Sequence, residues 1–202
     1  KGQKEVAVID GVESKEYDSV RNFTFSPDGK RVAFKAQKGQ KKVAVIDGVE
    51  SQEYDEVWNV TFSPDGKRVG FFARKGQKGV AVIDGVESQE YDRVENFTFS
   101  PDSKRVGFTA RKNQKWVAVI DGVESQEYDR IMCEQNLFFC FVKGGKYAVA
   151  MGRNERLETS SSLIVDNKEL VKLKVASGIK EYSEGFFFLG YTGTKLYQIK
   201  CK

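Results

Sequence analysis

The sequence predicts an all-β fold in which four-stranded antiparallel units repeat along the chain. The segment VAVIDGVES begins four times at a constant spacing of 37 residues, at Val6, Val43, Val80 and Val117. The segment FTFSPDGKRV at 23–32 returns with small changes at 60–69 and 97–106. A period of this length is typical of proteins in which each repeat is one supersecondary unit packed on its neighbours.

Each repeat contains four short segments with strand character. Alternating runs rich in Phe, Thr and Val predict strands, and no segment has the periodicity or the capping residues of a helix. In the repeat 19–55 the predicted strands, named A to D, are 21–26, 30–36, 43–46 and 49–55. Four short strands in about 40 residues are typical of one blade of a β-propeller.

Tight turns join these strands. Between strands A and B, Pro27 presets the backbone of the first turn position and Gly29 supplies a left-handed residue. Between strands C and D, the dipeptide Asp47-Gly48 is a strong signal for a two-residue hairpin. A polar loop at 38–41 joins strands B and C.

The run F-S-P-D-G-K-R-V-A-F, followed by a hairpin onto V-A-V-I-D-G, resembles the WD40-like PD40 repeat of TolB-type β-propellers. The resemblance covers three repeats strongly and a fourth, diverged one weakly, and the chain lacks the G-H and W-D dipeptides of WD40 proteins proper. It implies a propeller fold, a binding surface at the blade end that carries the D–A and B–C connections, and a periplasmic or extracellular location. It implies no particular activity, because propellers host unrelated functions.

We predict one domain, 1–202, folded as a closed five-bladed propeller. The complete blades span about 19–55, 56–92, 93–129 and 130–174. The fifth combines the C and D strands of residues 1–18 with A and B strands from residues 175–202, and its closure removes exposed sheet edges. The alternative is an open fragment of a longer propeller.

Composition narrows the function. The net charge is only +4 with acids and bases interspersed, which argues against nucleic-acid binding. The chain has no His, and its three Cys show no C-x-x-C spacing, so we predict no cofactor, no metal and no catalytic His. No apolar stretch is long enough to span a membrane. We expect a monomer.

The positions at which the repeats differ suggest a binding face. In the windows 6–42, 43–79 and 80–116, 27 of 37 columns are identical and only four columns hold three different residues. These four are Ser19/Glu56/Arg93, Arg21/Trp58/Glu95, Lys35/Phe72/Thr109 and Lys42/Gly79/Trp116. All four are predicted at the end of the blade that carries the D–A and B–C connections, which we call the D–A/B–C face.

We therefore predict a non-enzymatic module that binds a protein or peptide through the D–A/B–C face. The candidate binding residues are aromatic and charged, as binding hot spots commonly are, and we name them Arg21, Lys35, Lys42, Trp58, Phe72, Arg74, Arg93, Glu95, Arg111, Trp116 and Arg130. Three alternatives stay open: neutral variation of exposed loops, a carbohydrate-binding propeller with Trp platforms at Trp58 and Trp116, and a glycoside hydrolase using Glu95 and Glu56.

Overall fold

The computed structural model describes residues 4–131, 140–142, 147–153, 161–165, 168–173, 175–182, 185–192 and 195–201, with side chains at 4–129 and 131. All regular structure in these residues is β-strand, as the sequence predicts. The chain divides into two compact units, Lys1–Tyr91 and Asp92–Lys202, and each is described by itself.

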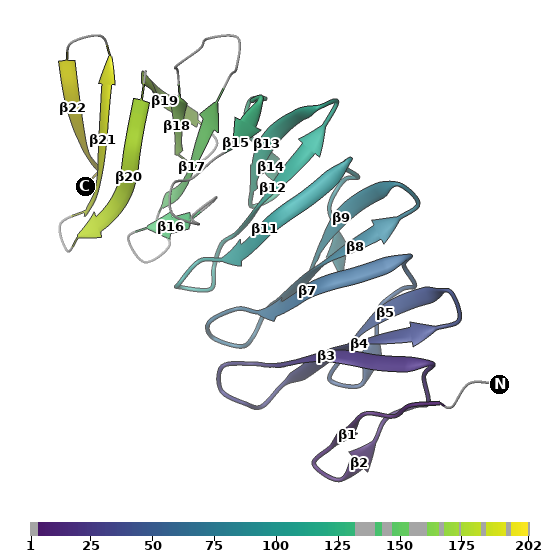
Figure 1. Ribbon diagram of the computed structural model, residues 1–202. Coiled ribbons are helices and arrows are strands. Elements are labelled where there is room, and N and C mark those ends of the chain that lie inside the picture. The colour runs from purple at the N-terminus through teal and green to yellow at the C-terminus, as the bar shows by residue number, and fades with distance from the viewer. Residues whose placement is uncertain are drawn as a thin grey trace. The chain divides into compact units, whose positions relative to one another are not determined.

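The first unit contains a short hairpin and two four-stranded antiparallel sheets (Figure 1). The hairpin is β1 Val8–Ile9 and β2 Val12–Glu13. The first sheet is β3 Ser19–Phe25, β4 Val32–Lys38, β5 Lys41–Ile46 and β6 Val49–Glu50. The second sheet is β7 Glu56–Phe62, β8 Val69–Lys75, β9 Lys78–Ile83 and β10 Val86–Glu87. The predicted A-B-C-D strand order of a blade is therefore confirmed in both.

The second unit begins with a third sheet of the same kind. Its strands are β11 Arg93–Phe99, β12 Val106–Lys112, β13 Lys115–Ile120 and β14 Val123–Glu124. A five-stranded sheet follows, with β15 Arg130–Ile131, β16 Cys140–Val142, β17 Tyr147–Arg153, β18 Ser161–Val165 and β19 Lys168–Leu173. The last sheet has three strands, β20 Val175–Tyr182, β21 Gly185–Thr192 and β22 Lys195–Cys201.

The last sheet differs from the sequence prediction, which placed only an A and a B strand after residue 174. Strand β20 pairs with β21 in addition to the expected β21–β22 hairpin. Its sequence, VASGIKEY, contains a Gly and charged residues that weaken a strand pattern. Five blades and closure of the ring remain predictions.

A β-bulge interrupts strand A in each of the three regular blades. The register of β3 against β4 shifts between Arg21 and Thr24, and Asn22 between them has φ of +58°. The equivalent Asn59 and Asn96 have φ of +53° and +60°. Asn tolerates this left-handed conformation better than most residues, so the recurring N-x-T sequence follows from the bulge.

The core of the first unit lies between neighbouring blades. One face of the first sheet, with Phe34, Ala36 and Val43, packs against Ala7 and Tyr17 of the preceding segment. On its other face, Ala44 packs against the second sheet, in a cluster with the side chains of Tyr54, Val57, Phe71, Ala73, Val80 and Val82. The middle strands of a blade are buried on both faces, which explains their apolar runs.

Candidate functional site at the D–A/B–C face

Strand register brings the repeat-variable positions into two neighbouring rows on one face of each sheet. In the first sheet the rows are Ser19–Gln37–Lys42 and Arg21–Lys35–Ala44. In the second sheet they are Glu56–Arg74–Gly79 and Trp58–Phe72–Ala81. Directly paired residues share a face of the sheet, and so do residues two apart along a strand. The four most variable columns are therefore neighbours in space.

In the first unit, several of these residues contact the adjacent blade. The Nζ atoms of Lys35 and Lys42 lie 3.1 and 2.8 Å from the two carboxylate oxygens of Glu56. The three side chains retain only 23%, 23% and 31% exposure. Burial alone would raise the pKa of Glu56, but the hydrogen bonds from Lys42 and Lys35 outweigh it and hold that pKa below its usual value. Glu56 is therefore an ionised partner of two cations from the preceding blade.

A second ion pair joins the N-terminal hairpin segment to the first sheet. The Arg21 guanidinium donates to both oxygens of Glu5, at 2.5 and 3.1 Å, and the Val20 N–H donates to Glu5 at 2.7 Å. The hydrogen bonds from Arg21 and Val20 lower the pKa of Glu5. Glu5 stands in the same repeat column as Lys42, one repeat earlier. At this contact the preceding segment supplies the acid, Glu5, and the first sheet supplies the cation, Arg21. At the contact between the first and second sheets the preceding sheet supplies the cations and the following sheet supplies the acid, Glu56.

Of the predicted aromatic residues, Phe72 is buried and the two Trp residues, Trp58 and Trp116, are partly exposed. Phe72 is fully buried, and Trp58, directly opposite, is partly buried with its ring centroid 5.7 Å from that of Phe72. Trp116 packs against a cluster that contains Ala118 and Tyr128. The sequence comparison associates variation between repeats with exposure, but a variable position such as Phe72 is buried in the structure.

The four remaining predicted cations are arginines, which differ in exposure. The side chains of three of them are described, and that of the fourth, Arg130, is not. Arg74 is exposed, and the side chain of Arg93 is 64% exposed and paired with Glu95. Arg111 is partly buried and lies between Arg93 and Trp116 in the register of the third blade. Arg130 lies in β15, opposite Arg153, and its side chain is outside the described residues.

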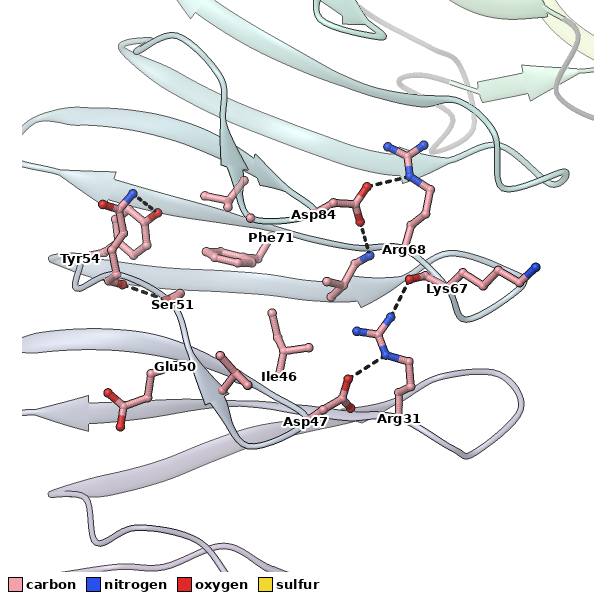
Figure 2. A pocket seen from close by; sticks show the side chains of 15 residues that line it. Arg31, Ile46, Asp47, Glu50, Ser51, Tyr54, Lys67, Arg68, Phe71 and Asp84 are labelled. Carbon is pink, nitrogen blue, oxygen red and sulfur yellow. Dashed lines mark hydrogen bonds and ion pairs between the residues drawn. The ribbon is translucent and has the colours of Figure 1, made fainter.

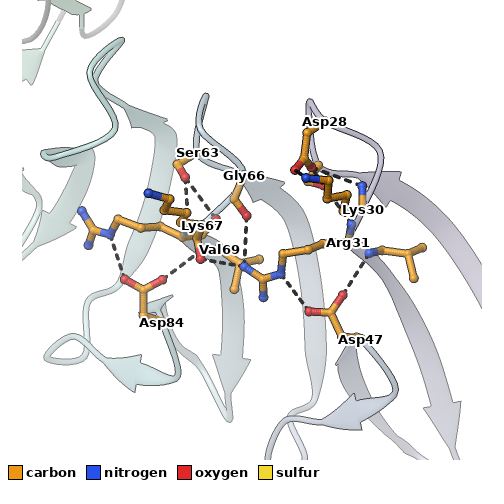
Figure 3. A network of polar contacts seen from close by, with 12 residues as sticks. Asp28, Lys30, Arg31, Asp47, Ser63, Gly66, Lys67, Val69 and Asp84 are labelled. Carbon is orange, nitrogen blue, oxygen red and sulfur yellow. Dashed lines mark hydrogen bonds and ion pairs between the residues drawn. The ribbon is translucent and has the colours of Figure 1, made fainter.

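At the opposite end of the blades, invariant charged residues hold the turns and join the blades (Figure 3). The Arg31 Nε donates to Asp47 at 2.8 Å, and its Nη1 donates to the carbonyl oxygens of Gly66 and Lys67 at 3.1 and 2.6 Å. Asp28, in the A–B turn, accepts a hydrogen bond from the Ser26 hydroxyl at 2.6 Å. These acids serve the turns, and no group of three potential metal ligands occurs among the described residues.

A cleft of about 780 Å³, which the sequence did not reveal, lies between the two sheets of the first unit. Figure 2 shows the side chains that line it. Its floor is apolar, with Ile46, Val69, Phe71 and Val82, and charged residues including Arg31 and Lys67 border it. The D strands are only two residues long, far shorter than the predicted 49–55. The short outer strand leaves space beside the neighbouring blade. The cleft was not predicted because the sequence did not show how short strand D is.

No protein-family model and no curated protein matches this chain. Among solved structures it is similar to the β-propeller domain of the Trilobed protease from Pyrococcus furiosus, with 14% identity, a TM-score of 0.46, and coverage of 95% of this chain and 72% of that one. It is similar to TolB from Acinetobacter baumannii, with 12% identity and a TM-score of 0.43 over 88% of this chain and 53% of TolB.

An acylaminoacyl peptidase from Pyrococcus horikoshii is a further similar structure, with 10% identity, a TM-score of 0.40 and coverage of 93% of this chain and 40% of the peptidase. The chain thus spans about half of TolB and less than half of the peptidase. Within the residues that can be described, no helix has the length and apolar character of a membrane span.

Proposed function

We propose that this chain is a non-enzymatic, TolB-like β-propeller module that binds a protein or peptide through its D–A/B–C face. The observation that carries the proposal is that partly exposed Trp58, opposite Phe72, and exposed Arg74, opposite Glu56, lie in neighbouring rows on one face of the second sheet. Aromatic and Arg side chains in such partly desolvated settings are typical of binding hot spots. The residues that pair across blades, Lys35 and Lys42, would support this surface instead of contacting the partner.

The acids at this face support binding over catalysis. A glycoside hydrolase needs one carboxylic acid with a raised pKa beside a second carboxylate. The pKa values of Glu5, Asp18 and Asp55 are lowered by hydrogen bonds from a Lys or Arg side chain and from a backbone N–H. The pKa of Glu56 is lowered too, as described above. Among the described acids with a shifted pKa at this end, none has the character of a general acid.

The proposal includes closure into a five-bladed ring. Phe62 of the second blade is 8% exposed because the first sheet covers it, with Ala33 in the same cluster and the Arg31 guanidinium 5.1 Å from its ring centroid. Its repeat equivalent in the first blade, Phe25, is 59% exposed. Among the described residues, the two-stranded hairpin β1–β2 comes before that blade. A further A–B hairpin would cover Phe25, and we propose that β21–β22 of this chain provides it.

Pull-down from a lysate of the source organism tests the binding proposal. The native chain is compared with Trp58→Ala and Arg74→Glu, and Lys67→Glu, an exposed cation at the opposite end, is the matched control. Each variant must first show an unchanged melting temperature. We expect one partner protein that the native chain and Lys67→Glu retain and that Trp58→Ala and Arg74→Glu lose.

Two results would contradict the proposal. Equal retention by all four proteins would remove Trp58 and Arg74 from the binding surface. Binding to a glycan array, lost in Trp58→Ala and without a protein partner, would instead favour a carbohydrate-binding propeller.

A further inference from the structure

Because the repeats are nearly identical, a blade could pack against the wrong neighbouring blade during folding. The apolar contacts between blades are made by invariant residues, such as Val57, Ala73 and Val80, whose columns are the same in all three repeats. The Tyr17 hydroxyl donates to Glu50 at 3.0 Å, and the equivalent Tyr54 donates to Glu87 at 2.8 Å. Because these contacts are the same at each interface, they cannot distinguish the correct neighbouring blade from a wrong one.

We propose that the repeat-variable charges specify which blade packs on which. Among the ion pairs that cross between blades in the first unit, three join residues of the most variable columns: Glu5 with Arg21, and Lys35 and Lys42 with Glu56. The basic face of the blade 19–55 thus fits a neighbour with an acidic residue in the Glu56 column. The N-terminal segment, with its acidic residue Glu5, fits a neighbour with a basic residue in the Arg21 column.

The arrangement within one blade supports this inference independently. Arg21 lies directly opposite Lys35 in the register of β3 and β4. Like charges directly opposite one another destabilise a sheet. Each of the two cations is compensated by a carboxylate from a different side of the blade, Glu5 before it and Glu56 after it. Both neighbours are therefore needed to make this blade electrostatically favourable.

Wrong neighbours would bring like charges together. If the blade 56–92 followed the N-terminal hairpin directly, Glu5 would face Glu56 in place of Ser19, and Trp58 would replace its partner Arg21. If a second copy of the blade 19–55 followed the first, Lys42 would face Arg21 and Ser19 without a carboxylate. If the blade 56–92 were skipped, Lys35 and Lys42 would face Arg93, which occupies the Glu56 column. Repulsion of this kind gives specificity against wrong partners.

A charge-reversal cycle tests whether the pairs are coupled. Glu56→Lys and the double variant Lys35→Glu/Lys42→Glu each place like charges together and should lower the melting temperature by about 3–8 °C. The triple variant Lys35→Glu/Lys42→Glu/Glu56→Lys restores opposite charges and should recover most of that loss. If the triple variant loses as much in melting temperature as Glu56→Lys and Lys35→Glu/Lys42→Glu lose together, the proposal is overturned.

A block exchange tests whether the charges specify order. The segments 19–55 and 56–92 are exchanged in the full chain, so composition and all invariant contacts stay the same. We expect a melting temperature lower by about 5 °C or more and a rise in dimers on size-exclusion chromatography, as blades seek matching neighbours in a second copy. The control, Lys30→Gln, removes a cation whose side chain is 81% exposed and whose ion pair, with Asp28, lies within its own turn.

The control should match the native chain. An exchanged chain that is monomeric and as stable as the native one would show that blade order does not depend on these charges. If the exchanged chain fails to fold at all, the charge-reversal cycle decides the question alone.

Discussion

Arg31 joins two blades through the Nε and Nη1 atoms of its guanidinium group, and its removal should destabilise the fold measurably. Its side chain is 29% exposed, so each contact is only partly screened by solvent. The hydrogen bonds to Asp47 and to the Gly66 and Lys67 carbonyls contribute about 0.5–1 kcal/mol each, and the contact with the Phe62 ring contributes about 0.5–1 kcal/mol. Arg31→Ala should therefore lower the free energy of unfolding by about 2–4 kcal/mol.

The assay is thermal and urea unfolding followed by circular dichroism. For a chain of this size, 2–4 kcal/mol corresponds to a fall in melting temperature of about 4–16 °C. Lys30→Ala is the matched control, because the Lys30 side chain is 81% exposed and should cost less than about 0.5 kcal/mol. Arg31→Lys keeps the charge without the planar fork and should fall between the two. If Arg31→Ala and Lys30→Ala unfold at the same temperature, Arg31 does not join the blades as described.

Three further predictions concern turns, bulges and titration. Gly66→Ala should cost about 1 kcal/mol more than Gly29→Ala in urea unfolding, since both glycines have positive φ but only at Gly66 would a Cβ lie 3.1 Å from the Ser26 Cβ. Asn59→Val should cost about 1–2 kcal/mol and Asn59→Gly little, because φ is +53° there; equal losses would contradict the bulge account. Melting curves against pH should show stability falling below about pH 4.5, where carboxylates with lowered pKa such as Glu56 take up protons, and again above about pH 10, because burial raises the pKa of Tyr54 to about 12. A melting temperature that is constant from pH 3 to pH 11 would show that neither group is bonded as described.

The architecture was predictable because local signals and the repeat period agree. Asp47-Gly48 forms the expected two-residue turn between β5 and β6, with φ of +51° and +81°. The apolar residues that alternate in strands A to C became the inter-blade core. The Asn22 bulge was not predicted, because residues 21–26 have the alternating pattern of an uninterrupted strand.

The candidate site was predictable only in part. The rows that gather Arg21, Lys35 and Lys42 follow from strand register, which the hairpin turns determine. The sequence could not show that Lys35 faces the next blade. A blade has two covered faces, and alternation with a period of two does not show which face packs against which neighbour. For the same reason the burial of Phe72 was not foreseen. The cleft between β6 and the second sheet depends on strand length, the least certain property of a predicted element.

Closure of the chain into a ring is the claim on which the propeller account depends most directly. In a closed five-bladed ring, β22 would pair with the segment that contains Val6, in the manner of β4 and β5, where Ala36 lies directly opposite Val43. With Cys201 in the place of Ala36, Val6→Cys, at the repeat equivalent of Val43, would lie close enough to Cys201 for a disulfide, which needs Cα atoms about 4.4–6.8 Å apart. Mass spectrometry of the oxidised monomer should identify a peptide joined through residues 6 and 201, absent when Cys201→Ser is added. If the Val6→Cys monomer forms no bond to Cys201, as is expected of the control variant Lys67→Cys, the result would contradict closure and leave an open array of blades.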